Sequence, residues 1–215
     1  MWRDAGYVDG LDGYLAVLID HCGHGESDVV DDPRAYTPAS YAGDVLAVLD
    51  ELGCERFAFL GYSDGARVGY ELGAESGDRL AALVGIGGVD QPDLDPQELH
   101  DAARAVRAGG LASILGDEPA PEWLLAQLGE TPPEVVAREL EGFAGWSPWP
   151  LFERIAAPTL IVAGEYEAEG VADAVQALPR GEAVVLPGLG HLGTFAAAEL
   201  VVAEVVPFLL RAVLT

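Results

Sequence analysis

The sequence contains no lysine, and 11 arginine side chains stand against 36 acidic ones. The resulting formal net charge of −25 over 215 residues repels phosphate backbones and anionic lipid headgroups. We therefore expect neither nucleic acid nor a membrane surface among the partners of this protein. Two interpretations of the missing lysine stay open: a coding bias toward GC-rich codons, or adaptation of the surface to high salt.

Cysteine is also scarce, since Cys22 and Cys54 are the two thiols in the chain. Small secreted domains carry dense disulfide frameworks instead, so the composition favours a reduced, cytoplasmic setting. The first residues show no basic region followed by an apolar run, so we expect no signal peptide. Glu199, Glu204 and Pro207 interrupt the last apolar stretch, which predicts a packed helix rather than a membrane span.

Half of the residues are hydrophobic, which is enough to bury a core in a chain of single-domain length. Stretches with helical spacing separate short apolar runs, and one such stretch begins with Thr37 as N-cap and Pro38 in the first turn. This alternation is typical of an α/β fold with a mainly parallel, doubly wound sheet. The apolar runs that predict buried strands are residues 15–20, 57–60, 80–86, 158–162 and 183–186.

Residues 91–150 differ from the rest, because they contain helical stretches and prolines but no clear buried strand. We expect a helical cap or lid inserted between two strands, with the core of the domain in residues 1–90 and 151–215. Helices are predicted at 96–108, 122–128 and 133–143. Trp123, Trp146 and Trp149 either line a substrate pocket together with Tyr62 or form the core of the insertion.

The segment Gly61-Tyr62-Ser63-Asp64-Gly65 lies directly between a predicted strand and a predicted helix. A sharp turn between such elements holds the serine in a strained conformation, with its hydroxyl near the helix N-terminus. The glycines on either side allow neighbouring elements to approach without Cβ clashes. The bare pattern is weak, but in this context it predicts a nucleophile elbow with Ser63 as the nucleophile.

A serine nucleophile needs a base, and the base needs an orienting acid. His191 follows the last predicted strand in a glycine-rich loop, where it can reach the carboxyl ends of the parallel strands. Glu165, Glu167 and Glu169 follow the strand before it, and Asp90 follows the preceding strand. The chain order serine, acid, histidine is the hydrolase order. The residue pattern leaves the choice among the four carboxylates open.

A second histidine pattern lies near the N-terminus, where His21 and His24 stand close to Glu26 and Asp28. Two histidines in a turn, with no third ligand at a diagnostic spacing, are weak evidence for a metal site. We therefore predict no bound metal.

Four segments, at residues 19–28, 61–65, 158–164 and 187–192, resemble the α/β-hydrolase superfamily in its branch of small serine esterases, lactonases and carbon–carbon bond hydrolases. The resemblance implies a cofactor-independent hydrolase of a small ester, lactone or related carbonyl substrate. Ser63 and His191 would form a catalytic triad with an acid three residues after Gly164. That acid is Glu167, with Glu165 as the second choice. The backbone N–H of Asp64 would donate a hydrogen bond in the oxyanion hole.

The resemblance begins in the middle of the family's fold. Relatives carry further strands before the run at residues 15–20, and a His-Gly loop that supplies a second oxyanion N–H. We expect either that the natural start lies upstream of Met1 or that this is a shortened relative with impaired hydrolysis. The alternative function is therefore a non-catalytic binding or regulatory protein that keeps the fold.

Overall fold

The computed structural model describes residues 1–89, 95–116 and 118–213. In these residues, four strands form one parallel sheet in the order β1-β2-β3-β4. In register, Ile86 lies opposite Tyr62 on one side and Val162 on the other. The strands are β1 (Phe57–Tyr62), β2 (Leu80–Ile86), β3 (Thr159–Gly164) and β4 (Gly181–Leu186).

Helices precede, separate and follow these strands. The helices outside the 91–150 insertion are α1 (Tyr7–Gly10), α2 (Pro38–Glu51), α3 (Asp64–Glu75), α8 (Val171–Ala177), α9 (His191–Ala196) and α10 (Ala198–Val213). Those within it are α4 (Pro96–Gly109), α5 (Glu122–Leu128) and α6 (Pro133–Phe143), and α7 (Trp149–Phe152) crosses its end. The 3-10 turns are η1 (Pro33–Tyr36), η2 (Gly77–Arg79), η3 (Leu111–Ser113) and η4 (Glu165–Glu167).

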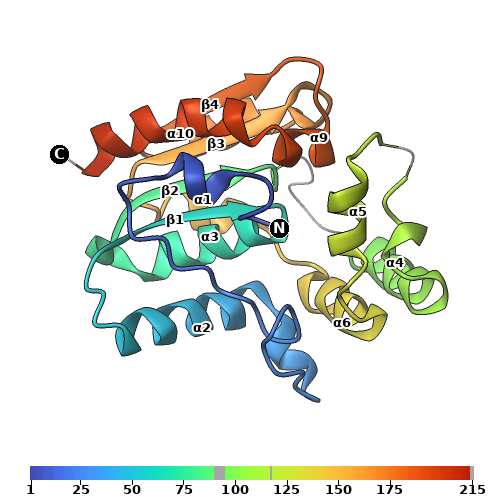
Figure 1. Ribbon diagram of the computed structural model, residues 1–215. Helices are drawn as coiled ribbons and strands as arrows, with labels where there is room; N and C mark the ends of the chain where they lie inside the picture. Colours follow the sequence, from blue (N-terminus) through green and yellow to red (C-terminus); the bar gives the residue numbers. More distant parts are fainter. Residues whose placement is uncertain (90–94, 117, 214–215) are drawn as a thin grey trace.

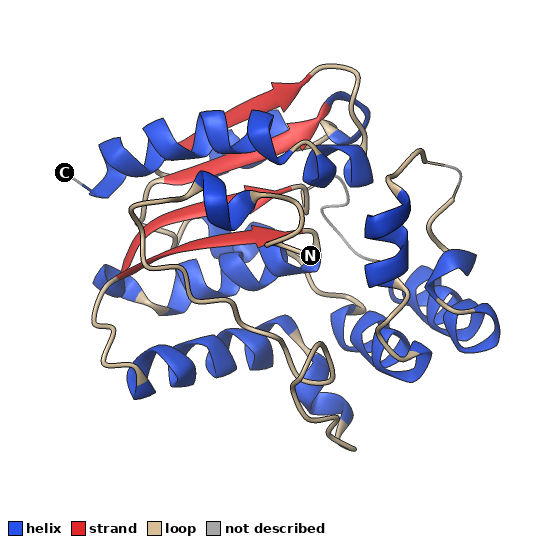
Figure 2. Cartoon of the chain, viewed as in Figure 1, coloured by secondary structure: helices blue, strands red, loops and turns tan. Residues whose placement is uncertain are grey.

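The helices cover both faces of the sheet, as the alternation of apolar runs predicted (Figures 1 and 2). Successive side chains of a strand point to opposite faces. On β3, Ile161 packs into the core cluster that contains residues of α2, α3 and α8, whereas Leu160 and Val162 pack into the cluster formed with α9 and α10. A near-continuous apolar sequence is therefore what each central strand requires.

Local signals set the bounds of α2. The Thr37 side chain accepts a hydrogen bond from the backbone N–H of Ser40 at 3.1 Å, and Pro38 occupies the first turn. Gly53, with a φ of 65°, follows the last turn. The predicted N-cap and the predicted end of this helix are both confirmed, because each depends on residues within one turn of it.

The predicted strand at residues 15–20 is wrong. No backbone hydrogen bond pairs this run with β1 in the described residues, and the Leu15 side chain is 94% exposed rather than buried. A strand is held by hydrogen bonds to a neighbouring backbone, and a local apolar run does not specify that neighbour. In the part of the chain that the structure describes, β1 therefore forms one edge of the sheet and β4 the other.

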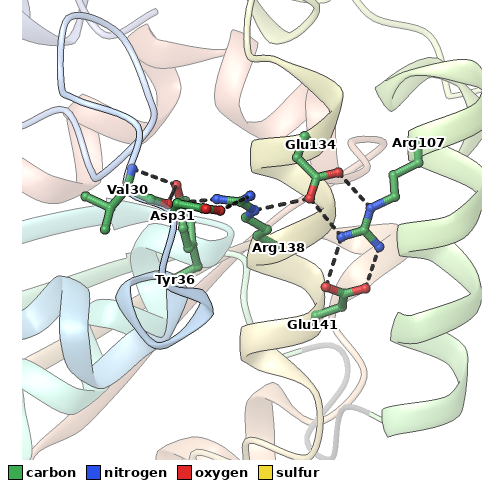
Figure 3. Close-up of polar contacts among 7 residues, drawn as sticks. All are labelled: Val30, Asp31, Tyr36, Arg107, Glu134, Arg138 and Glu141. Atoms are coloured by element: carbon green, nitrogen blue, oxygen red, sulfur yellow. Dashed lines mark hydrogen bonds and ion pairs between the residues drawn. The ribbon is translucent and has the colours of Figure 1, made fainter.

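Helices α4, α5 and α6 of the insertion lie beyond the carboxyl ends of the strands (Figure 1). A chain of ion pairs connects α4 and α6 with the loop before η1, as Figure 3 shows. Arg107 of α4 pairs with Glu134 and Glu141 of α6, at 2.8 and 2.5 Å. Arg138 of α6 pairs with Glu134 at 3.1 Å and with Asp31 at 2.8 Å. The pairs are mostly exposed, so each adds little to the stability of the fold.

No helix in the described ranges combines the length and the apolar character that crossing a bilayer requires.

Candidate active site

The candidate active site begins at the turn between β1 and α3. Ser63 has φ 55° and ψ −116°, and it is the one non-glycine residue with positive φ in the part of the chain that the structure describes. Such a conformation costs about 1–3 kcal/mol and persists where its surroundings impose it. Here the Ser63 backbone N–H donates to the carbonyl of Ile86 at 2.8 Å, which anchors the turn to β2.

Glycine is required on one side of Ser63 and not on the other. A Cβ on Gly61 would overlap the carbonyl group of Gly65, whereas a Cβ on Gly65 would meet no atom within 4 Å. The expected steric need for glycine is therefore confirmed at position 61 and wrong at position 65. The reason is that the end of β1 packs its Gly61 α-carbon directly against the backbone of the first turn of α3.

Three side chains from separate segments meet at this turn. Nε2 of His191 lies 2.8 Å from Oγ of Ser63, and Nδ1 of the same ring lies 2.5 Å from Oε2 of Glu167. A carboxylate only accepts hydrogen bonds, so these partners assign the ring proton to Nδ1 and leave Nε2 to accept from the serine hydroxyl. Two consecutive hydrogen bonds of this kind are what a Ser-His-acid nucleophile needs.

Glu167 is held rigidly, since its side chain is buried and both of its oxygens are occupied. Oε2 faces His191, and Oε1 accepts a hydrogen bond from the backbone N–H of Gly164 at 3.1 Å. Gly164 ends β3, so the carboxylate is anchored to the carboxyl end of a central strand. A fixed acceptor fixes both the tautomer and the orientation of the imidazole.

The other candidate acids lie elsewhere. Glu165 is exposed, and its Oε2 accepts a hydrogen bond from the backbone N–H of Gly188 at 2.7 Å. Glu169 is exposed too. Asp90 lies outside the described residues. Among the described carboxylates, the geometry therefore favours Glu167 as the partner of His191.

Tyr62 contacts both the backbone and the ring of His191. Its hydroxyl donates to the backbone carbonyl of His191 at 3.1 Å, and the two rings stack with centroids 4.8 Å apart. Burial, followed by the nearby charges of Glu167 and Glu118, raises the pKa of Tyr62 above its usual 10. Tyr62 therefore stays a neutral hydrogen-bond donor, and it positions the imidazole rather than facing open solvent.

Gly87 is a residue of this site that sequence reasoning missed. It follows β2 with a φ of 67°, and its N–H donates to the Val162 carbonyl at 2.8 Å. A Cβ here would lie 3.0 Å from Cε1 of His191 and 3.2 Å from Oε2 of Glu167. The sequence feature that could have indicated it is the pair of glycines directly after the strand at 80–86. This pair follows the strand at the sheet edge where the acid and the base were expected.

The predicted oxyanion donor is the first residue of α3, so the Asp64 backbone N–H has no partner within the helix. The Asp64 side chain pairs with Arg67, one turn further along. The carboxylate of Asp64 is thus paired with Arg67, whereas its backbone N–H has no partner within α3. A role of the N–H toward an oxyanion stays a prediction.

The three tryptophans divide between two hydrophobic clusters. Trp123 of α5 packs against the cluster that contains Tyr62, whereas Trp146 and Trp149 pack against the other one. Trp146 also donates from its indole N–H to Glu71 of α3 at 2.7 Å. Trp146 and Trp149 are therefore partly buried beside the core, and a substrate pocket lined by Tyr62 and the three tryptophans stays a prediction.

The two histidines near the N-terminus, His21 and His24, contact an aromatic ring, a carboxylate and a backbone carbonyl. His21 stacks on Tyr41, with ring centroids 4.5 Å apart. His24 Nε2 lies 3.4 Å from the buried Glu139 of α6, and His24 Nδ1 lies 3.2 Å from the Cys22 carbonyl. No group of three or more histidine, cysteine, aspartate or glutamate side chains in the described ranges is arranged to hold a metal ion.

Comparisons with known proteins show which family the chain belongs to. The curated relatives include a protein named as a carbamate hydrolase, RutD, from Caulobacter sp. (strain K31), which is 30% identical over 60% of this chain and 50% of its own length. Epoxide hydrolase B of Mycobacterium tuberculosis is 38% identical over 34% of this chain and 21% of its own length. The chain thus spans half or less of the length of these curated relatives.

Solved structures match over far more of the chain. A thermophilic esterase from Thermogutta terrifontis superposes with a TM-score of 0.83 and 23% identity, over 97% of this chain and 84% of the esterase. The enol-lactonase from Burkholderia xenovorans LB400 superposes with a TM-score of 0.76 and 25% identity, over 88% of this chain and 78% of the lactonase. The family model described as the alpha/beta hydrolase fold matches residues 1–121. Because that match covers more than half of the chain, the protein belongs to the α/β-hydrolase fold family.

Proposed function

We propose that this protein is a cofactor-independent serine hydrolase that acts on a small ester, lactone or related carbonyl compound. The observation that carries the proposal is the hydrogen-bonded chain from Ser63 through His191 to Glu167, built on a strained turn at the carboxyl ends of β1 and β3. Family membership and the similarity to an esterase and an enol-lactonase support the choice of reaction.

In the first half of the proposed reaction, Oγ of Ser63 attacks the carbonyl carbon of the substrate. The hydroxyl proton passes to Nε2 of His191, and the carbonyl π electrons move to oxygen to form a tetrahedral oxyanion. The Asp64 backbone N–H donates to that oxygen. Glu167 stabilises the imidazolium that has formed, because its carboxylate already accepts from Nδ1.

In the second step, the oxyanion collapses and the bond to the leaving oxygen breaks. His191 returns the proton to that oxygen, and an acyl group remains on Ser63. Water then repeats the sequence: His191 takes a proton from the water, which attacks the acyl carbon, and Ser63 leaves with the proton. The products are a carboxylic acid and an alcohol, or a hydroxy acid from a lactone.

Residues 91–150 act as a cap in this proposal. Their helices α4, α5 and α6 lie beyond the carboxyl ends of the strands, the same end at which β1 delivers Ser63 and β3 leads to Glu167 (Figure 2). A cap in this place excludes water from the acylation step and shapes the substrate pocket.

Hydrolysis of nitrophenyl acetate, butyrate and octanoate by the purified chain tests the proposal, with Ser63→Ala as the control. We expect turnover by the parent protein, and a loss of about a thousandfold or more in the variant. A matched control is Ser113→Ala, which changes an exposed serine in η3 outside the site.

Equal hydrolysis by the parent and Ser63→Ala would overturn the assignment of Ser63. A folded parent protein that hydrolyses no ester or lactone would overturn the hydrolase assignment and support a binding protein on the same fold.

A further inference from the structure

One residue of the insertion contacts the helix turn that carries His191. Glu118 lies between η3 and α5, and its Oε1 accepts a hydrogen bond from the backbone N–H of Gly193 at 3.0 Å. Gly193 is the third residue of α9, and His191 is the first. The contact joins two segments that lie 75 residues apart in the sequence.

This turn has room for the Glu118 carboxylate because the residue before His191 is Gly190. A Cβ on Gly190 would lie 2.7 Å from Oε1 of Glu118 and 2.9 Å from its Cδ. The N-cap of α9 is Gly190 itself, which offers no side-chain hydrogen bond to the first turn. Glu118 therefore supplies from a distant segment the acceptor that a serine or aspartate N-cap supplies within the chain.

The same turn is held from its other side by the core. Tyr62 donates to the His191 carbonyl at 3.1 Å, and Glu167 and Ser63 hold the two ring nitrogens. The backbone that bears the imidazole is thus fixed between Tyr62 of the sheet and Glu118 of the insertion. The charge of Glu118 reaches this site, since it contributes to the raised pKa of Tyr62.

We propose that Glu118 is a positioning residue that couples the insertion to His191. When its carboxylate is seated on Gly193, the first turn of α9 holds Nε2 of His191 toward Ser63, and when the contact is lost the imidazole loses that alignment. The proposal rests on the proposed function for its effect on catalysis, and on the contacts of α9 for its effect on the ring.

Two substitutions separate position from charge. Glu118→Gln keeps an amide oxygen that can accept from Gly193 but removes the charge, whereas Glu118→Ala removes both. Misalignment of the base lowers kcat by about 10–100-fold in Glu118→Ala alone, with KM little changed.

Glu122→Ala is the matched control, because Glu122 is an exposed glutamate of the same insertion, in the first turn of α5. It leaves kcat unchanged. A kcat for Glu118→Ala equal to that of the parent, or an equal loss in Glu118→Gln, overturns the positioning role. Melting curves of all four proteins confirm that they are folded.

A second measurement does not depend on turnover. The proton that His191 Nδ1 donates to Glu167 gives a low-field proton NMR resonance, which His191→Gln identifies by removing it. We expect this resonance to persist in the parent, Glu118→Gln and Glu122→Ala and to broaden or vanish in Glu118→Ala. An unchanged resonance in Glu118→Ala overturns the proposal. A parent protein without ester turnover refutes the proposed function, and the resonance still decides the role of Glu118.

Discussion

Two histidine–glutamate pairs of the molecule differ in what faces the second ring nitrogen. His191 has the Glu167 carboxylate on Nδ1 and the Ser63 hydroxyl on Nε2. His24 has the Glu139 carboxylate on Nε2 and the Cys22 carbonyl on Nδ1. A hydroxyl can donate a proton, whereas a carbonyl can only accept one.

In the proposed reaction, this difference separates His191, which acts as a base, from His24, which does not. Both nitrogens of His24 face acceptors, so the doubly protonated imidazolium satisfies both, and no basic nitrogen remains. Burial by itself lowers the pKa of His24, but the hydrogen bond to Glu139 and the charge of Glu139 outweigh it and raise the pKa above 6.5. A histidine beside a carboxylate is therefore suited to base catalysis only when a proton donor occupies its other nitrogen.

The largest expected effect comes from removing each imidazole in turn. His191→Ala should lower kcat/KM for a nitrophenyl ester by about a thousandfold or more, because Ser63 loses its base. His24→Ala should lower it less than about tenfold, since His24 contacts no proposed reacting group. Adding Ser63→Ala to His191→Ala should cost little more, because the triad acts as a unit. A larger loss in His24→Ala than in His191→Ala would reverse the comparison.

The second largest expected effect is a difference in kcat between variants of the two glutamates of η4. Glu167→Gln should lower kcat by about a thousandfold or more, because an amide in its place removes the charge that stabilises the imidazolium. Glu165→Gln should stay within about tenfold of the parent, since Glu165 accepts from Gly188. Steady-state kinetics at saturating ester measures both. The opposite ranking would make Glu165 the acid.

The pair at α6 should affect stability, with a defined pH dependence. Because the folded-state pKa of His24 is raised above 6.5, its contribution to the free energy of unfolding is fully present below pH 6.5 and is lost as the pH rises through the raised value. His24→Gln should therefore destabilise the protein by about 1–3 kcal/mol near pH 6 and by less near pH 9. Urea unfolding at both pH values measures the difference.

Other titrating groups set the control for that experiment. Burial raises the pKa of Glu139 above 4.5 although the hydrogen bond from His24 lowers it, and burial with the charge of His24 lowers the pKa of His21 to about 4. His21→Gln, in which His24 is unchanged, should show no loss of effect between pH 6.5 and 9. A His24→Gln effect that grows with pH would contradict the assigned direction.

The smallest expected effect is the loss of stability on replacing Arg138, which neighbours Glu139 on α6. Arg138 pairs with Glu134 and Asp31 in the exposed network of Figure 3. Arg138→Gln should destabilise the protein less than Glu139→Gln, and its effect should fade between about 0.1 and 1 M NaCl because salt screens exposed pairs. Thermal melting at both salt concentrations checks this. An Arg138→Gln effect that salt leaves unchanged would place the stabilisation in packing against Tyr36 instead.

Local features of this site were predictable from the sequence. Ser63 follows from a strand, a glycine-flanked turn and a helix within a few residues, and α2 follows from Thr37 and Pro38 in the same way. His191 follows from its place after the last strand. The choice of Glu167 came from the resemblance to a family, because the residue pattern alone left Glu165, Glu167, Glu169 and Asp90 open.

Features that depend on distant neighbours were not predictable. The run at 15–20 has the composition of a strand, but pairing decides strands, and no described backbone pairs with it. Gly87 matters because His191 of α9 and Glu167 of η4 lie against the position that a Cβ on Gly87 would take. Glu118 meets Gly193 across 75 residues, a contact that no local pattern contains.

The most direct test of the central claim is covalent labelling of Ser63. A fluorophosphonate transfers its phosphonyl group to an activated serine hydroxyl and releases fluoride, so labelling reports the nucleophile without any assumption about the natural substrate. Intact-mass and peptide mass spectrometry should find one phosphonyl group per chain, on Ser63, in the parent and in His24→Ala, and none in Ser63→Ala or His191→Ala. Folded parent protein that takes up no label, or takes it up equally in His191→Ala, would contradict the account.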